Sequence, residues 1–297
     1  MYHILAVLTV CIWGTTFVST KVLLASGLTP TNIFGVRFAL AYAGMALICH
    51  KSWFCRNWRD ESAMLIAGMT GGSLYFWAEN TALCHARAGT VSLIVCLAPL
   101  FTTLFASFLS RRNAVAPRVW LWTLVALAGV ALIVSGDDEG SPAASPLLGG
   151  GLALVASLSW AVYQLVIKRL GDRYGAAMLT RKVFGYGLLT ILLFHAVSTP
   201  GGLYADGALL GLTGQLLQRP TVWANLLFLG LIASLACYFV WSKIVEKLGA
   251  VASANYIYLN PLSTCAFSAI FLGEQFTATM VVGGLAIIVG LYQAVRR

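Results

Sequence analysis

The sequence contains very little charge for its length. Only 10% of its 297 residues are Asp, Glu, Lys or Arg, whereas an ordinary soluble domain carries about 25%. Hydrophobic residues make up 59% of the chain, and the mean hydropathy is +0.84. Two soluble domains, which the length would otherwise suggest, could not be covered with so few charged side chains. The composition therefore excludes a soluble protein.

Sequence motifs for enzymatic chemistry are also missing. No Walker loop is present, so this chain does not itself hydrolyse ATP, and no GxSxG, HExxH or dinucleotide fingerprint occurs. The seven cysteines are odd in number, form no CxxC pair and mostly lie in apolar stretches, which indicates buried thiols. The four histidines are scattered and suggest no metal set. We expect no enzymatic activity, no metal and no cofactor.

What the chain does contain is a series of long apolar stretches. Each is long enough to cross a hydrocarbon core of about 30 Å as a helix. We predict an all-α polytopic membrane protein with ten transmembrane helices. Their approximate spans are 3–24, 31–50, 63–84, 88–109, 118–136, 147–168, 178–198, 223–243, 249–271 and 277–295.

The basic residues predict the orientation of these helices. Of the nineteen Lys and Arg residues, fifteen fall on one side of the membrane, Arg87 and Arg219 fall on the other, and Lys21 and Arg37 lie within helices. Because basic loops stay in the cytoplasm, both termini are predicted to be cytoplasmic, in a cell (inner) membrane. The net charge of +9 then reflects topology, and we expect no nucleic-acid partner.

The chain contains an internal repeat. Trp13, Phe17 and Lys21 match Trp160, Gln164 and Lys168 at an offset of 147; Gly68, Gly72, Tyr75 and Glu79 match Gly230, Ser234, Cys237 and Trp241 at an offset of 162; and Pro99 matches Pro261 at that same offset. We predict a first five-helix repeat at 1–136, a polar linker at 137–146 and a second repeat at 147–297. Because five is odd, the second copy enters the membrane from the other side, which is typical of transporters. An inert structural duplication is the alternative.

These features together resemble a known family. They are Trp13-Gly14-Thr15-Thr16-Phe17, Lys21, Arg37 after the Pro30 loop, Pro99, Pro261 and the turn Leu272-Gly273-Glu274-Gln275. With these motifs in this order, the chain resembles the EamA branch of the drug/metabolite transporter superfamily over its whole length. One departure is that the first half reads Arg111-Arg112 where the second half has Gly273-Glu274.

The resemblance implies a metabolite, amino-acid or drug exporter of the inner membrane. It also implies a central cavity lined by helices 1, 3, 4, 6, 8 and 9, with helices 5 and 10 at the periphery.

Lys21, Arg37 and Glu79 fall within predicted helices, in the outer half of the membrane. A charge at the centre of such a helix costs about 2.5–3.5 kcal/mol. We expect Glu79 to pair with Lys21 or Arg37 and so form an outer gate; a permanent structural salt bridge, or Lys and Arg side chains that reach the interface, is the alternative. Glu79 is the only acid that this interpretation buries in a helix, so it is the obvious site for proton coupling. An uncoupled facilitator is the alternative. We expect Glu274 to cap the start of the last helix.

Pro99 and Pro261 remove helical hydrogen bonds at equivalent places and predict bending points beside a cavity, with ordinary kinks as the alternative. Aromatic side chains near helix middles predict a wall suited to a small amphipathic solute. The full set of candidates for substrate binding or gating is Trp13, Phe17, Lys21, Arg37, Tyr75, Glu79, Pro99, Trp160, Tyr163, Gln164, Tyr238, Trp241, Asn255, Tyr258, Asn260 and Pro261.

The sequence therefore predicts a secondary transporter. It would export a small organic metabolite, an amino acid or a related amphipathic compound, by alternating access. An integral membrane lipid-modifying enzyme and a non-transporting membrane scaffold are the alternatives. The expected partners are the solute and the lipid bilayer. Small residues in the fifth and tenth helices also predict close packing, either within the chain or in a homodimer.

Overall fold

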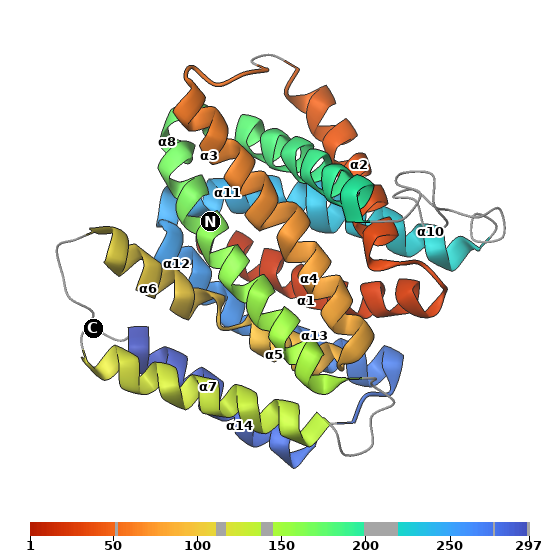
Figure 1. Ribbon diagram of the computed structural model, residues 1–297, viewed down its shortest axis with the longest axis vertical. Coiled ribbons are helices and arrows are strands. Elements are labelled where there is room, and N and C mark those ends of the chain that lie inside the picture. Colours follow the sequence, from red (N-terminus) through yellow and green to blue (C-terminus); the bar gives the residue numbers. More distant parts are fainter. Residues whose placement is uncertain (51–52, 111–116, 138–144, 199–218, 276, 296–297) are drawn as a thin grey trace.

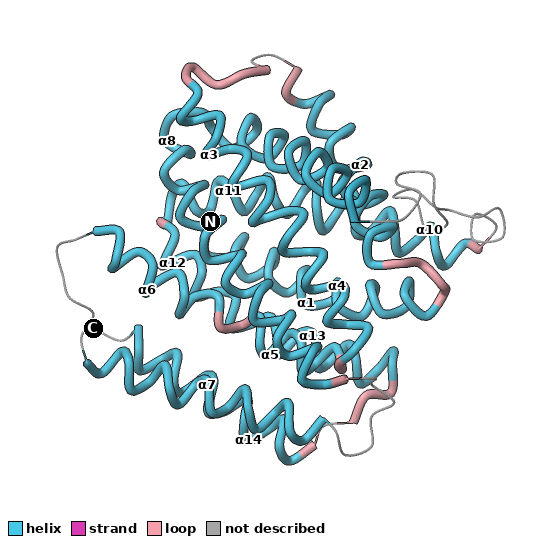
Figure 2. The backbone as a smooth tube through the Cα atoms, in the orientation of Figure 1, coloured by secondary structure: helices cyan, strands magenta, loops and turns pink. Residues whose placement is uncertain are grey.

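The computed structural model is built from helices that run side by side (Figures 1 and 2). It describes residues 1–50, 53–110, 117–137, 145–198, 219–275 and 277–295, and within these ranges there is no strand. The helices are α1 (Tyr2–Ala25), α2 (Pro30–Ile48), α3 (Trp58–Gly68), α4 (Leu74–His85), α5 (Ala88–Val95), α6 (Ala98–Ser110), α7 (Pro117–Asp137), α8 (Pro146–Ser198), α10 (Pro220–Leu227), α11 (Cys237–Leu248), α12 (Ala250–Ala254), α13 (Asn260–Leu272) and α14 (Ala278–Val295). The predicted all-α membrane fold is confirmed.

Several of these helices continue directly into one another. The π-helical segments η1 (Met69–Ser73) and η3 (Phe228–Ala236) join α3 to α4 and α10 to α11, and the 3₁₀ segment η4 (Asn255–Leu259) joins α12 to α13. By contrast, α8 consists of two helices separated by a kink at Gly175, whose φ of 71° lies outside the helical region. Helices α5 and α6 also form one continuous apolar stretch, Ala88–Leu109. The described residues therefore form ten rods, close to the predicted spans.

Within the part of the chain that the structure describes, five helical stretches are long and apolar enough to cross a membrane: Tyr2–Ala25, Pro30–Ile48, Ala88–Leu109, Pro146–Ala196 and Pro220–Leu248. Ten crossings remain a prediction. The predicted linker, 137–146, lies mostly outside the described residues.

The matched motifs of the two halves run in opposite directions. Lys21, near the end of α1, is 3.2 Å from Glu274, which in turn binds the amide of Ala88 at 2.9 Å. Gly149, near the start of α8, packs so closely on Ala86 that a Cβ there would lie 2.8 Å from the Ala86 side chain. The end of α1 and the start of α8 therefore share one end of the molecule. The first rods of the two halves are antiparallel, as an inverted repeat requires.

The helical interruptions also recur in both halves. At the offset of 162, η1 maps onto residues 231–235, which lie inside η3. The turn at 96–97, between α5 and α6, maps onto the end of η4. The turn at 96–97 and the end of η4 come just before Pro99 and Pro261, which cannot continue the helical hydrogen-bond ladder. The prolines therefore sit at equivalent discontinuities of two otherwise similar rods.

Helices α7 and α14 pack against each other at the edge of the bundle (Figure 1). Gly129 and Gly283 lie at their closest approach, where a Cβ on either would be 2.6 Å from the carbonyl oxygen of the other. A Cβ on Gly290 would likewise lie 2.8 Å from the Trp122 carbonyl oxygen. The small faces predicted in helices 5 and 10 are thus used within one chain, and a homodimer through these helices remains a prediction.

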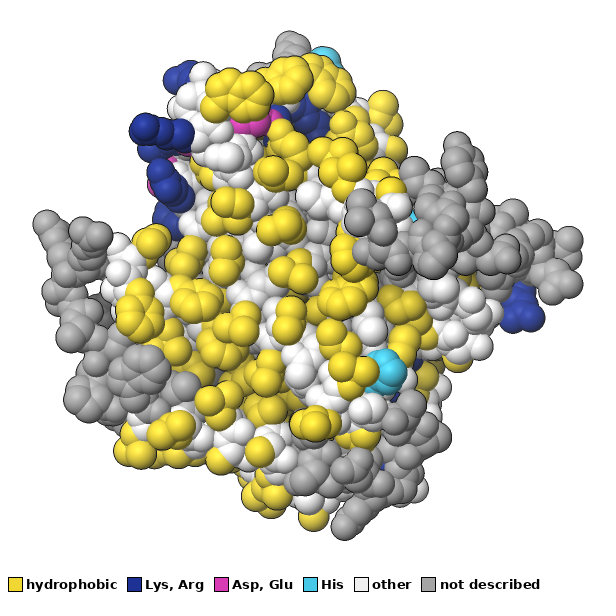
Figure 3. Space-filling model, in the orientation of Figure 1, with side chains coloured by type: hydrophobic (Ala, Val, Ile, Leu, Met, Phe, Trp, Pro, Cys, Tyr) yellow, Lys and Arg dark blue, Asp and Glu magenta, His cyan; other side chains and the backbone are white. Residues whose placement is uncertain are grey.

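Charged side chains gather at one end of the molecule, which we call the basic end: residues 53–61, 168–182 and 243–249. Figure 3 shows Lys and Arg concentrated there, above a largely hydrophobic middle. Asp60 at this end accepts hydrogen bonds from Arg173 at 3.0 Å and Tyr174 at 2.7 Å, and Glu61 pairs with Lys182. Asp60 and Glu61 are both buried in α3. The expectation that Glu79 is the only acid buried in a helix is therefore wrong, because tertiary partners from α8 cover the start of α3.

Glu61 makes stability depend on pH in the acid range. Burial alone would raise its pKa, but hydrogen bonds from Lys182, Tyr186 and the Cys55 amide outweigh burial and lower the pKa to about 2 from 4.5. A lowered folded-state pKa contributes stability above the unfolded value, and this contribution is lost as the pH falls through the folded value. We expect the Tm of the native chain in detergent to fall between pH 4.5 and pH 2. The Glu61→Gln variant should have a lower Tm than the native chain at pH 7 and a smaller fall over the same pH range. Asp172→Asn, an exposed acid at the same end, should follow the native chain; an unchanged acid response in Glu61→Gln would contradict this account.

Candidate functional site

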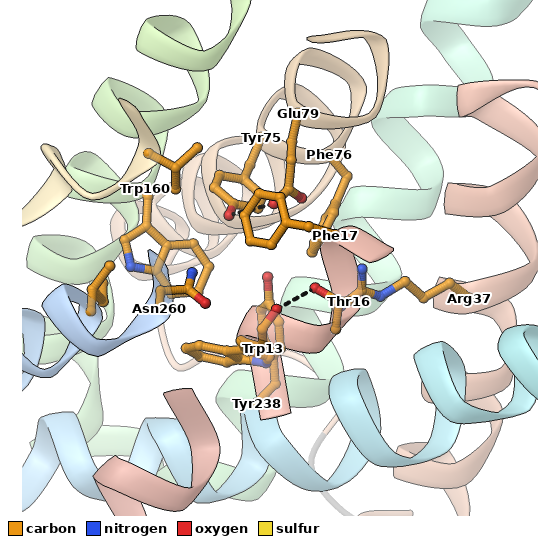
Figure 4. A pocket seen from close by; sticks show the side chains of 12 residues that line it. Trp13, Thr16, Phe17, Arg37, Tyr75, Phe76, Glu79, Trp160, Tyr238 and Asn260 are labelled. Carbon is orange, nitrogen blue, oxygen red and sulfur yellow. Dashed lines mark hydrogen bonds between the residues drawn. The ribbon is translucent and has the colours of Figure 1, made fainter. Parts of the chain in front are cut away.

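A small pocket lies in the middle of the bundle, between helices of both halves (Figure 4). Its volume is about 30 Å³, which holds no more than one or two water molecules. Its lining residues are Trp13, Thr16, Phe17, Arg37, Tyr75, Phe76, Glu79, Val95, Trp160, Tyr238, Ile257 and Asn260. The lining comes from the helices that the family resemblance implies, and from α2 through Arg37.

An aromatic wall surrounds most of this pocket. The ring centroids of Trp13 and Trp160 are 5.3 Å apart in an edge-to-face arrangement, and those of Tyr75 and Trp160 are 5.0 Å apart. Tyr238 lies 5.7 Å from Trp13 and 5.8 Å from Trp160. Figure 4 shows these rings facing a common space. Such a wall favours the apolar part of a solute.

The π-helical segments hold the aromatic wall in place. Trp13 Nε1 donates to the carbonyl of Ala233 in η3 at 2.9 Å, and the Tyr238 hydroxyl donates to the carbonyl of Gly71 in η1 at 2.8 Å. A π-helical turn departs from the regular α-helical ladder, so carbonyl groups there can accept from other helices. Each half therefore anchors an aromatic side chain of the other half.

Two opposite charges face the pocket without pairing directly. Glu79 accepts a hydrogen bond from Tyr75 at 3.1 Å, and Arg37 donates through Nε to Ser234 at 2.5 Å. The Arg37 guanidinium also lies 4.2 Å from the centroid of the Phe76 ring. Among the ion pairs of the described residues, none within 4.0 Å includes Arg37 or Glu79. The predicted direct pairing of Glu79 is wrong in this structure, because each charge has its own neutral partner.

Two polar atoms of the pocket lack a hydrogen-bond partner within the described residues. They are Trp160 Nε1, a donor, and Asn260 Oδ1, an acceptor, and both side chains are buried. An unsatisfied buried polar group costs about 1–3 kcal/mol. A polar solute between them could satisfy both, which makes this pocket the candidate binding site.

The end opposite the basic end is closed by Lys21 and Glu274. The ammonium of Lys21 lies 3.2 Å from a carboxylate oxygen of Glu274, which also accepts from the backbone amides of Ala88 at 2.9 Å and Gly89 at 3.3 Å. A carboxylate at a helix N-terminus is stabilising. The expectation that Glu274 caps the last helix is therefore wrong. Glu274 caps α5, because Glu274 and Gln275 contact residues 87–89 at the start of α5. Arg111 and Arg112, which replace this motif in the first half, lie outside the described residues.

Half of the predicted candidates do not line the pocket. Gln164 accepts from Trp241 Nε1 at 3.2 Å, and Tyr163 packs on Gly71. Lys21 belongs to the end closure described above. The residues outside the lining are Lys21, Pro99, Tyr163, Gln164, Trp241, Asn255, Tyr258 and Pro261.

Four lining residues were not among the predicted candidates: Thr16, Phe76, Val95 and Ile257. Val95 and Ile257 are related by the offset of 162 and precede the two helix breaks. The repeat alignment could therefore have identified them. Phe76 matches Tyr238, a predicted candidate, at the same offset, so the repeat alignment could have identified it too.

The unsatisfied Asn260 oxygen gives a measurable prediction. Asn260→Leu keeps a similar volume and removes the buried acceptor, so the protein without solute should gain about 1 kcal/mol or remain unchanged. If the native chain shows a rise in Tm with a bound solute, the same variant should lose that rise. The measurement is Tm of the detergent-purified chain with and without solute. A loss of stability without solute, with the ligand response retained, would show that Asn260 is a structural residue.

Glu274 should matter more for stability than its ionic partner. Glu274→Ala removes two capping hydrogen bonds at the start of α5 and leaves Lys21 without its carboxylate, so we expect a loss of about 1–3 kcal/mol. Lys21→Gln removes only the part-exposed ion pair and should cost about 1 kcal/mol or less. Gln275→Ala, an exposed neighbour, is the matched control. Chemical or thermal unfolding in detergent tests this order, and equal losses at Lys21 and Glu274 would contradict the capping role.

The chain is similar to known proteins over nearly its whole length. The model of the EamA-like transporter family matches residues 1–135 and 147–296. An "Uncharacterized transporter" of Archaeoglobus fulgidus is 27% identical over 295 residues, covering 98% of this chain and 96% of the relative.

Two further relatives carry more specific names. The "Probable terminal-alkyne amino-acid exporter" of Streptantibioticus cattleyicolor is 27% identical and covers 98% of this chain and 92% of the relative. The "Probable amino-acid metabolite efflux pump" of Escherichia coli K12 is 24% identical, with 97% and 93% covered. One solved crystal structure matches with a TM-score of 0.63 at 19% identity, covering 99% of this chain and 96% of the solved chain. At that identity the match concerns the fold alone.

Proposed function

Because the chain belongs to the EamA-like transporter family, we propose that this transporter exports a small zwitterionic, amphipathic solute, an amino acid or a close derivative, by alternating access. The observation that carries the proposal is the central pocket. It combines two separate opposite charges, an unsatisfied donor and acceptor, and an aromatic wall. Membership of a transporter family removes the lipid-modifying enzyme from consideration.

The pocket can recognise each part of an amino acid. Glu79 would bind the ammonium group and Arg37 the carboxylate, since charge-assisted hydrogen bonds are the strong ones. Trp13 and Trp160 would contact the apolar side chain. The names of two relatives, which refer to amino-acid export or efflux, support the same solute class.

The pocket must widen for such a solute to enter. A volume of about 30 Å³ admits water but not an amino acid, so this structure corresponds to a closed form. The points that allow movement are the discontinuities before Pro99 and Pro261, because the helical ladder is already broken there. The π-helical segments η1 and η3 are further points where the halves can change shape.

Each end of the molecule has its own closure. Lys21 and Glu274 close one end, and Glu61 with Lys182 closes the basic end. Alternating access would open one closure at a time, with the basic end and both chain termini in the cytoplasm of a cell with an inner membrane.

Proton coupling has one candidate group in the pocket. Glu79 is the only carboxylate in the lining, so protonation there would release the ammonium group of the solute. An uncoupled facilitator is the alternative. Net solute movement with and without an imposed pH gradient distinguishes the two mechanisms.

Reconstituted protein tests the proposal. We expect saturable counterflow of a labelled amino acid in liposomes, and at least a tenfold loss in Glu79→Gln, because the loss of one charge-assisted contact is worth about 1.5–3 kcal/mol. Glu246→Gln, which alters a carboxylate paired with Lys247 near the basic end, should transport normally.

Folded Glu79→Gln protein with full counterflow would contradict the role of Glu79. Absence of counterflow by any amino acid in the native chain would contradict the solute class.

A further inference from the structure

A second hollow lies at the basic end, between α2 and the second rod of α8. Its volume is about 190 Å³, and Tyr42, Trp53, Arg181, Lys182, Tyr186 and Leu189 line it. It shares no lining residue with the central pocket. Of its lining residues, only Lys182 takes part in the proposed transport cycle, through its ion pair with Glu61.

Two adjacent cations form the floor of this hollow. Arg181 and Lys182 are only 2% and 7% exposed. Arg181 donates to the carbonyl of Cys49, and its guanidinium lies 4.7 Å from the Trp53 ring centroid. The Lys182 ammonium lies 5.1 Å from the Phe54 ring centroid. Aromatic side chains therefore cover both cations and shield them from bulk water.

The surroundings of the hollow carry net positive charge. The described residues 53–61 and 173–189 contain five cations, Arg56, Arg59, Arg173, Arg181 and Lys182, and two carboxylates, Asp60 and Glu61. Hydrogen bonds hold the pKa of both carboxylates below the usual value, so both remain ionised at neutral pH. Their two charges cannot balance five cations.

The hollow also lies at the level of the predicted membrane surface. Trp53, Phe54 and Trp58 are exposed beside it, and such rings gather where hydrocarbon meets headgroups. Leu189 is half-exposed on its rim and faces away from the bundle core. Figure 3 shows Lys and Arg side chains recessed among hydrophobic ones at the upper edge of this face. A molecule that fills the hollow would have an anionic head and an apolar body.

We propose that this hollow binds the headgroup of an anionic phospholipid of the cytoplasmic leaflet. The phosphate would lie against Arg181 and Lys182, since basic pockets between transmembrane helices suit acidic headgroups. Trp53 and Leu189 would contact the glycerol and the first methylene groups. This inference depends neither on the identity of the solute nor on the direction of transport.

The test is lipid binding by the full chain, purified in neutral detergent and stripped of lipid. Native mass spectrometry would titrate phosphatidylglycerol and phosphatidylcholine with identical acyl chains. We expect a Kd about tenfold lower for phosphatidylglycerol, as befits a charge-assisted contact. Leu189→Trp, which fills the hollow from its exposed rim and keeps every charge, should abolish the preference. Arg181→Gln should also abolish it, and Lys243→Gln, a cation at the same end but outside the hollow, should retain it.

The outcomes separate the alternatives. Equal affinity for the two lipids in the native chain overturns the proposal, as does a preference that survives in folded Leu189→Trp protein. Inorganic phosphate that displaces phosphatidylglycerol at equal concentration would assign the hollow to free phosphate instead. Should Arg181→Gln fail to fold, Leu189→Trp still tests the proposal, because it leaves the buried cations in place.

Discussion

Within a bilayer, every backbone carbonyl that leaves its helical hydrogen bond must find another donor. That constraint explains how the two halves of this transporter hold together. The π-helical segments η1 and η3 accept hydrogen bonds from Tyr238 and Trp13, which lie in opposite halves of the chain. The same two side chains belong to the aromatic wall of the central pocket. The irregular backbone, the contact between the halves and the pocket are therefore one feature of the structure.

The charges follow a related logic. Arg37 and Glu79 are buried at the centre, yet each is satisfied by a neutral partner, Ser234 or Tyr75. The absence of a direct salt bridge between them is what the proposed binding of a zwitterionic solute requires, because each charge would bind the opposite group of that solute. The charges that do pair, Lys21 with Glu274 and Glu61 with Lys182, lie toward the two ends. Ion pairs thus stabilise the two ends, whereas the two opposite charges of the central pocket are not paired with each other.

Hydropathy alone predicts the helices, because a membrane helix needs a continuous apolar stretch whatever its neighbours are. The repeat offset also places the helix breaks beside Pro99 and Pro261, and half of the predicted candidates line the pocket. The partners of individual charges could not be predicted. Glu274 binds amides 185 and 186 residues away in α5, and helical spacing carries no information about such a contact. The α3 acids were missed for the same reason, since residues of α8 bury them.

The central claim is that two antiparallel halves enclose a pocket that opens to one side at a time. Electron-resonance distances between spin labels test it most directly, in a chain whose native cysteines are replaced. One label pair would span the end that holds Ser26 and Ser145, and a second pair would span the basic end at Asn57 and Gly249. The account predicts that an added amino acid shifts both distance distributions in opposite directions. A single distance at each end, unchanged by any amino acid, would contradict alternating access through this pocket.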